Sequence, residues 1–218
     1  MTALSPAPIP ELAFAVTGAE RLEHAAVPTI ELVLRVRAVD GRSIRSIVLD
    51  AQIQIAARRR AYGPDEQVRL FELFGPPAGW GSALRTLPWL RSTLVIPPFT
   101  GATQVRVPLP CSYDLEVAAS RFFDSLRGGE VPLELLFSGS VFYEGPGGAL
   151  QTARLPWTQE AEFRLPVALW KETMERYFRG TAWVRLRKES FDRLAAYKAR
   201  RALGSWEEAV DELLEGRE

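Results

Sequence analysis

Apolar and polar residues alternate with a period of two along much of this chain, and this pattern constrains the fold more than any other feature. Between Thr29 and Ala38, every second residue from Ile30 to Val36 is apolar, and charged residues fall on the opposite face. The same period predicts strands in the segments 12–16, 49–57, 93–96, 104–109, 131–143, 150–155 and 161–167. Strands with one polar face are typical of antiparallel sheets packed face to face. We therefore predict a mainly β protein, an immunoglobulin-like β-sandwich.

One of these strands contains a run of small residues, Ser138-Gly139-Ser140. A glycine inside a strand pattern indicates either a bulge or a close approach of another backbone. We expect one of these two features at Gly139.

Helical spacing interrupts the strands at two places, which predicts helical crossovers on the sandwich. The first helix begins at Pro64, where a proline and two acids suit a first helical turn, and Val68, Phe71 and Phe74 form its expected inward stripe. Trp80, Leu84 and Leu87 predict a further short helix. The second crossover has apolar residues at helical spacing from Leu115 to Leu126 and a stop at Gly128-Gly129.

The chain becomes helical beyond Pro166. Trp170, Met174 and Phe178 lie four apart, a short strand is predicted from Trp183 to Leu186, and a helix follows from about Lys188 to Arg201. Ser205 and Glu208 form a capping box for a last helix, whose Ala209, Val210, Leu213 and Leu214 are expected to face inward. We predict a sandwich domain over 11–166 and a helical C-terminal region over 167–218, α+β overall.

Composition excludes several kinds of site. Lys plus Arg and Asp plus Glu both number 27, so no bulk positive charge attracts nucleic acid. One His and one Cys cannot complete a zinc or iron site, and we predict no metal, no cofactor and no catalytic residues. The first ten residues lack the basic start and apolar run of a signal peptide, and no stretch approaches the roughly 20 apolar residues of a membrane helix. We expect a cytoplasmic protein without membrane contact.

His24 and Cys111 are the residues that an enzyme would use. A general base needs a nucleophile within reach, and no motif of the chain marks such a pair. An enzyme using His24 or Cys111 therefore stays an alternative to the non-catalytic interpretation.

The densest basic run, Arg58-Arg59-Arg60, stands at the end of a predicted strand close to Tyr62. Arginine and aromatic residues are common anchors of protein interfaces, and they also form internal ion pairs and core contacts. We predict a partner-binding site made of Arg58, Arg59, Arg60, Tyr62, Trp80 and Trp89, with internal ion pairing as the competing interpretation.

The order of strand, helix, turn and helix after Trp183 is similar to the ribbon-helix-helix fold of DNA-binding dimers, with Arg185 and Arg187 facing the bases. The last helix is acidic, however, and no basic arm accompanies it. A DNA-binding regulator is therefore a second alternative, and a packed or dimerising hairpin is preferred.

Four segments carry a resemblance to an uncharacterised actinobacterial family: Arg58 to Gly63, Leu73-Phe74-Gly75 with Trp80-Gly81, Pro110 to Asp114, and Leu136 to Phe142. That family bears a domain-of-unknown-function label, and its genes are often found beside a nickel-iron hydrogenase and its maturation factors. The resemblance implies an accessory role in hydrogenase assembly or function. The strand order is also similar, more weakly, to the immunoglobulin-like water-stress and late-embryogenesis domain. We expect a cytoplasmic binding or scaffold protein with a protein partner, in a chain that is either monomeric or a homo-oligomer.

Overall fold

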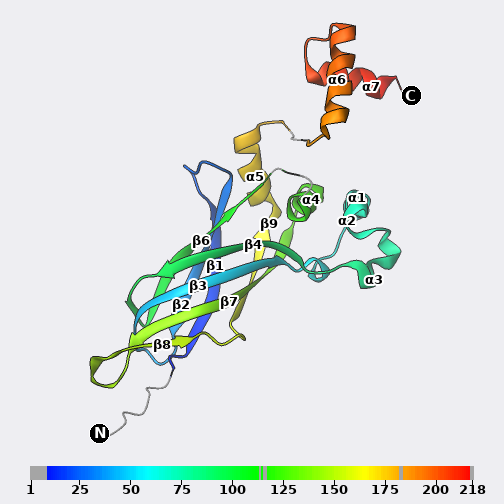
Figure 1. Cartoon of the computed structure of the whole chain (residues 1–218). Helices are drawn as coiled ribbons and strands as arrows, with labels where there is room; N and C mark the ends of the chain where they lie inside the picture. Colours follow the sequence, from blue (N-terminus) through cyan, green and yellow to red (C-terminus); the bar gives the residue numbers. More distant parts are fainter. Residues whose placement is uncertain (1–8, 113, 115–116, 182–183, 217–218) are drawn as a thin grey trace. The chain divides into compact units, whose positions relative to one another are not determined.

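Two antiparallel sheets form the framework of the computed structural model, which describes residues 9–112, 114, 117–181 and 184–216 (Figure 1). The first sheet has the order β1-β2-β6, with β1 Leu12–Arg21, β2 Thr29–Ala38 and β6 Ala102–Pro110. The second has the order β4-β3-β7-β8, with β4 Leu87–Ile96, β3 Ser43–Ile55, β7 Glu130–Glu144 and β8 Leu150–Arg154. Two further strands complete it: β5 Phe99–Thr100 pairs with β3, and β9 Glu160–Pro166 pairs with β7.

The core of the sandwich lies between these sheets and is made by the apolar faces of the alternating strands. Ile30, Leu32 and Leu34 of β2 and their counterparts on β3 and β7 are fully buried in one cluster. The ring of Phe14 in β1 stacks on that of Phe137 in β7, with centroids 4.7 Å apart, so the two sheets are in direct contact. The prediction of a mainly β, two-sheet fold with helices is confirmed.

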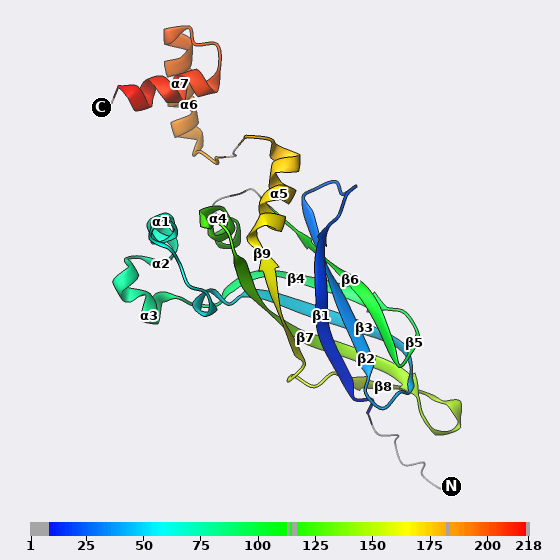
Figure 2. The ribbon, with the colours of Figure 1, turned by 180° about the vertical axis from the view of Figure 1, so that it is seen from behind.

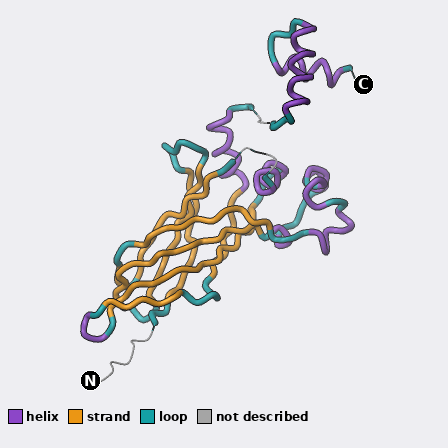
Figure 3. The backbone as a smooth tube through the Cα atoms, viewed as in Figure 1, coloured by secondary structure: helices purple, strands orange, loops and turns teal. Residues whose placement is uncertain are grey.

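The helices of the sandwich unit gather at one end of the sheets, as Figures 2 and 3 show. They are the 3₁₀ turns η1 Ala57–Arg59 and η2 Pro77–Gly79 and the helices α1 Pro64–Arg69, α2 Phe71–Phe74, α3 Trp80–Ala83, α4 Ala118–Ser125 and α5 Val167–Phe178. At the opposite end, the turn η3 Pro146–Gly148 joins β7 to β8. The expected crossovers are therefore present, although Leu115 lies outside the described residues.

Contacts divide the chain into one unit from Met1 to Ala182 and a second from Trp183 to Glu218. The division predicted at Pro166 differs from this one because α5 packs into the first unit. Trp170 and Met174 are buried, and the Trp170 ring stacks on Phe123 of α4 with centroids 5.3 Å apart. The spacing of Trp170, Met174 and Phe178 predicted the packed face of this helix, but the helix belongs to the sandwich unit and not to the C-terminal region in which it was expected.

The second unit holds the two helices α6 Lys188–Arg201 and α7 Trp206–Glu215. The Ser205 side chain accepts a hydrogen bond from the Glu208 N–H at 3.0 Å, so the predicted cap is present. The predicted strand is wrong: residues 184–187 have no regular secondary structure, and Trp183 lies outside the described part. The inward face of α7 is also wrong in part, because Ala209 is buried whereas Val210, Leu213 and Leu214 are exposed.

Gly139 is a point of close backbone approach, one of the two features expected there. Its φ is 145°, and a Cβ atom on it would lie 2.0 Å from the carbonyl oxygen of Val48 in β3. The two central strands of the second sheet therefore leave room only for glycine at this position.

Candidate functional site

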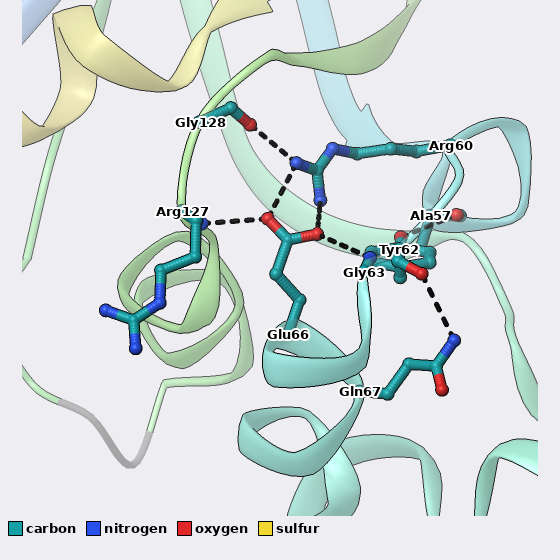
Figure 4. A network of polar contacts seen from close by, with 8 residues as sticks. All are labelled: Ala57, Arg60, Tyr62, Gly63, Glu66, Gln67, Arg127 and Gly128. Atoms are coloured by element: carbon teal, nitrogen blue, oxygen red, sulfur yellow. Dashed lines mark hydrogen bonds and ion pairs between the residues drawn. The ribbon is translucent and has the colours of Figure 1, made fainter.

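A buried ion pair between Arg60 and Glu66 lies at the base of the first helical insertion (Figure 4). The Arg60 guanidinium donates to both carboxylate oxygens of Glu66, at 3.1 and 2.9 Å, and to the Gly128 carbonyl at 2.6 Å. Only 10% of the Arg60 side chain and 8% of that of Glu66 are exposed. Such bidentate pairs fix geometry as well as charge.

The Glu66 carboxylate also accepts two backbone hydrogen bonds, from the N–H of Arg127 at 2.8 Å and from that of Gly63 at 3.3 Å. Burial by itself raises the pKa of Glu66, but the hydrogen bonds from Arg60, Arg127 and Gly63 outweigh it and hold the pKa below the usual value of a glutamate. The carboxylate therefore joins α1, the segment after η1 and the connection between α4 and β7.

Tyr62 and Trp80 form an aromatic layer on this ion pair. The Tyr62 hydroxyl donates to the Ala57 carbonyl at 2.6 Å, and its ring meets the Trp80 ring edge to face at 5.3 Å. The Arg60 guanidinium lies over the Tyr62 ring at 5.1 Å. The Trp80 indole N–H donates to the Gly75 carbonyl at 2.9 Å. These contacts are internal, and burial raises the pKa of Tyr62.

The other residues of the predicted partner-binding site also have internal contacts. Arg58 is exposed and donates to the Gly81 carbonyl at 2.6 Å, and Arg59 is exposed and paired with Glu134 and Glu162. Trp89 is half-buried, and its ring centroid lies 4.9 Å from that of Phe123. The structure thus brings Arg60, Tyr62 and Trp80 together in an internal cluster, while Arg58 and Arg59 are the members with exposed side chains.

Two exposed apolar side chains, Val68 and Phe71, lie on the outer surface of the same insertion. Their exposed fractions are 76% and 55%. Together with Pro64, Gln67, Glu72 and Pro77 they line a shallow groove of about 560 Å³. We call this surface the insertion groove. Ion pairs of Arg69 with Asp124 and of Arg121 with Glu72 tie its helices to α4.

Sequence reasoning placed Val68 and Phe71 in the core, and this prediction is wrong. The helix is interrupted at Leu70, which ends α1 and precedes α2, and the buried face consists of Glu66, Leu70 and Phe74. These three residues are four apart, which is as good a helical spacing as the stripe that was predicted. The stripe was missed because one of its members is a glutamate, which is buried here only through its pairing with Arg60.

The two residues of the enzyme alternative lie in different surroundings. His24 is exposed in the loop between β1 and β2. Cys111 is buried, its S–H donates to the Leu109 carbonyl, and burial raises the pKa of its thiol to about 12. A thiol with this pKa stays protonated at neutral pH and is a poor nucleophile. The described residues include no cluster of three or more His, Cys, Asp or Glu side chains that could hold a metal ion.

Two further hollows are lined by polar groups. One, of about 450 Å³, lies on the outer face of β3, β4 and β7 beside the exposed Trp157, and its Thr93 and Arg91 pair with Asp50 and Gln52. The other, of about 980 Å³, follows α5 and has acidic and basic side chains in its lining. The lining of the insertion groove is mainly apolar, whereas most residues that line these two hollows are polar or charged, so the insertion groove is the stronger candidate for docking an apolar side chain.

The fold and the site together define an α+β protein built on a two-sheet β-sandwich, with a helical insertion fixed by a buried ion pair. The chain belongs to the family described as a family of unknown function (DUF6084), which matches residues 9–218. No curated protein matches it. Within the described residues, no helix has the length and hydropathy needed to cross a membrane.

Several solved structures are similar to the chain at low identity. The putative ApaA protein from Bordetella pertussis is 12% identical, over 72% of this chain and 93% of that chain, with a TM-score of 0.25. β-Glucosidase 3B from Thermotoga neapolitana in complex with α-D-glucose is 10% identical, over 71% of this chain and 17% of that chain, with a TM-score of 0.25. A β-glucosidase from Kluyveromyces marxianus is 8% identical, over 71% of this chain and 15% of that chain, with a TM-score of 0.24.

Proposed function

We propose that this protein is a non-catalytic, cytoplasmic binding or scaffold protein, and that a protein partner docks on the insertion groove. The observation that supports the proposal is the exposure of Val68 and Phe71 on a helical insertion held in place by buried polar contacts. Exposed apolar side chains on a rigid support are what a docking surface needs, because little conformational entropy is lost when the partner binds.

The partner that fits this groove is a protein segment that inserts an apolar side chain. The lining is apolar except for Gln67 and Glu72, and the Glu72 carboxylate is paired with Arg121. The actinobacterial resemblance adds to the proposal that the partner is a nickel-iron hydrogenase or one of its maturation factors. The prediction of Arg58, Arg59, Arg60, Tyr62, Trp80 and Trp89 as the contacting residues is thereby revised. In the proposal, Arg60, Tyr62 and Trp80 support the groove from inside.

Changing Val68 and Phe71 to Ser in the tagged, full-length protein is expected to reduce capture of its partner at least about tenfold, since central apolar anchors of an interface each contribute roughly 1–2 kcal/mol or more. Stability is expected to change little, because both side chains are already exposed. The measurement is co-purification from the native host, with quantification of the proteins retained.

The matched control is Val95→Ser, which removes a similarly exposed apolar side chain from β4, outside the groove. It is expected to retain normal capture. Equal capture by the wild type and the Val68/Phe71 double variant, with both proteins folded, would exclude the groove as the docking surface.

A further inference from the structure

The C-terminal hairpin, residues 184–216, is organised by contacts between its two helices. The Phe191 ring of α6 lies 5.2 Å from the Trp206 ring of α7, and the Lys198 amine lies over the Trp206 ring at 5.7 Å. Arg201 of α6 forms an ion pair with Glu212 of α7. These contacts fix how the two helices of one hairpin lie against each other.

The hairpin nevertheless buries very little. Among its described residues, Ala209 is the one with a buried side chain, although the two helices have seven large apolar or aromatic residues: Phe191, Leu194, Tyr197, Trp206, Val210, Leu213 and Leu214. Trp206, Val210 and Leu213 follow each other at helical spacing and are each about two-fifths exposed, and Leu214 beside them is 64% exposed. The unit from Trp183 to Glu218 is also smaller than the roughly 40 residues below which a domain usually needs outside support. An apolar stripe of this kind calls for a partner surface.

The charges of the two helices indicate which partner. Helix α6 has five basic residues and two acidic ones, whereas α7 has five acidic residues and no basic one. Only part of this charge is used within the hairpin. In the described part of the chain, Arg193 and Arg200 of α6 and Glu207 and Asp211 of α7 have no ion-pair partner. A partner must therefore offer an acidic surface and a basic surface side by side, on either side of an apolar stripe.

A second copy of this hairpin has that pattern by construction. In a two-fold arrangement, α6 of the first copy faces α7 of the second, and α7 of the first copy faces α6 of the second. Each basic helix therefore meets an acidic one. The apolar stripes of both copies then meet at the centre of the dimer and cover each other. We propose that the C-terminal hairpin is a self-association element that joins two copies of this chain through an apolar centre and opposite helix charges.

The first test measures the mass of the full-length protein in solution over about a hundredfold range of concentration. The wild type is expected to approach twice the chain mass of 24.3 kDa as concentration rises. Changing Val210 and Leu213 to Gln should weaken self-association at least about tenfold, because it removes the apolar centre of the interface. The control is the double variant Val68→Gln with Phe71→Gln, which alters the insertion groove. Its solution mass should rise with concentration in the same way as that of the wild type. A wild type that stays monomeric throughout overturns the proposal.

The second test uses charge reversal to separate pairing with a second copy from docking on any other surface. One variant changes Arg193 and Arg200 to Glu, and the other changes Glu207 and Asp211 to Lys. Each variant alone should associate less than the wild type, because like charges now face each other. A mixture of the two should form a heterodimer of one copy of each variant, with association restored toward that of the wild type. Circular dichroism checks that both remain helical. A mixture that associates no better than either variant alone overturns the proposal. This result is independent of the insertion groove, so its failure leaves the proposed partner binding standing.

Discussion

Replacing Glu66 with Gln is expected to lower the free energy of unfolding by about 3 to 5 kcal/mol, because removal of one partner leaves the other charge of a buried ion pair uncompensated. Arg60 would keep its hydrogen bond to the Gly128 carbonyl but lose both charged acceptors. For a chain of this length, the change corresponds to a melting temperature lower by roughly 10 °C. Urea unfolding followed by tryptophan fluorescence measures it.

The matched control is Asp65→Asn, which neutralises the neighbouring carboxylate of the same helical turn. Asp65 is exposed, so the variant should lose no more than about 1 kcal/mol through its place in the first turn of α1. If the Asp65 and Glu66 variants were destabilised equally, the ion pair would not be what holds the insertion.

Because of the same ion pair, the free energy of unfolding is expected to depend on pH. Burial raises the pKa of folded Glu66, but its hydrogen bonds outweigh this effect and hold the pKa below the usual value of a glutamate, so the unfolded chain takes up the proton first as the solution is acidified. The contribution of the carboxylate is therefore complete above its ordinary pKa and is lost as the pH falls through the lowered value. The stability difference between the wild type and Glu66→Gln should shrink over that interval and stay constant above it.

The destabilisation by Glu66→Gln should also affect the helical insertion before it affects the sheets. Glu66 joins α1 to the segment after η1 and to the chain before β7; its carboxylate accepts hydrogen bonds from Arg60, Gly63 and Arg127, and none of these residues lies in β2 or β3. Hydrogen exchange in Glu66→Gln is therefore expected to rise first at residues 64–75 and only later in β2 and β3. This pattern would show that the ion pair positions the groove-bearing helices specifically.

The strands were predictable because their pattern is local. Burial of one sheet face requires alternation within each segment, so Ile30 to Val36 predict both a strand and its inward face without knowledge of its neighbours. The same holds for α5, where Trp170 and Met174 lie four apart and are both buried.

The site was less predictable because it depends on contacts that are distant in sequence. Arg60 is an internal residue because it donates a hydrogen bond to the Gly128 carbonyl, 68 positions away in the sequence. No residue near Arg60 in the sequence indicates this contact. Once Arg60 is internal, Glu66 can be buried, and Phe71 is left on the outer surface of the insertion. On α7, the apolar spacing is that of a buried helix although the hairpin leaves Val210 exposed. Such spacing predicts a face that will be covered, but it does not say whether the same chain or another one covers it.

Replacing Gly139 with Ala is expected to destabilise the protein by about 3 to 5 kcal/mol, the combined effect of an unfavourable backbone conformation and of overpacking. The added Cβ would lie 2.0 Å from the Val48 carbonyl oxygen and 3.2 Å from the Leu49 Cα, and both neighbours are backbone atoms of β3. A flexible side chain could move aside, but β3 is held by β4 on one edge and by β7 on the other. Separating the two central strands would also break the hydrogen bonds around the pair formed by Gly139 and Leu49.

The control for Gly139 is Gly18→Ala, in β1, where φ is not positive and a Cβ would meet nothing within 4 Å. This variant should be neutral or more stable by up to about 1 kcal/mol, because alanine restricts the unfolded chain more than glycine does. Urea unfolding of the two variants beside the wild type measures both effects, and failure of the Gly139 variant to accumulate as folded protein agrees with the expectation. A Gly139→Ala protein as stable as Gly18→Ala would mean that β3 and β7 can move apart at this point.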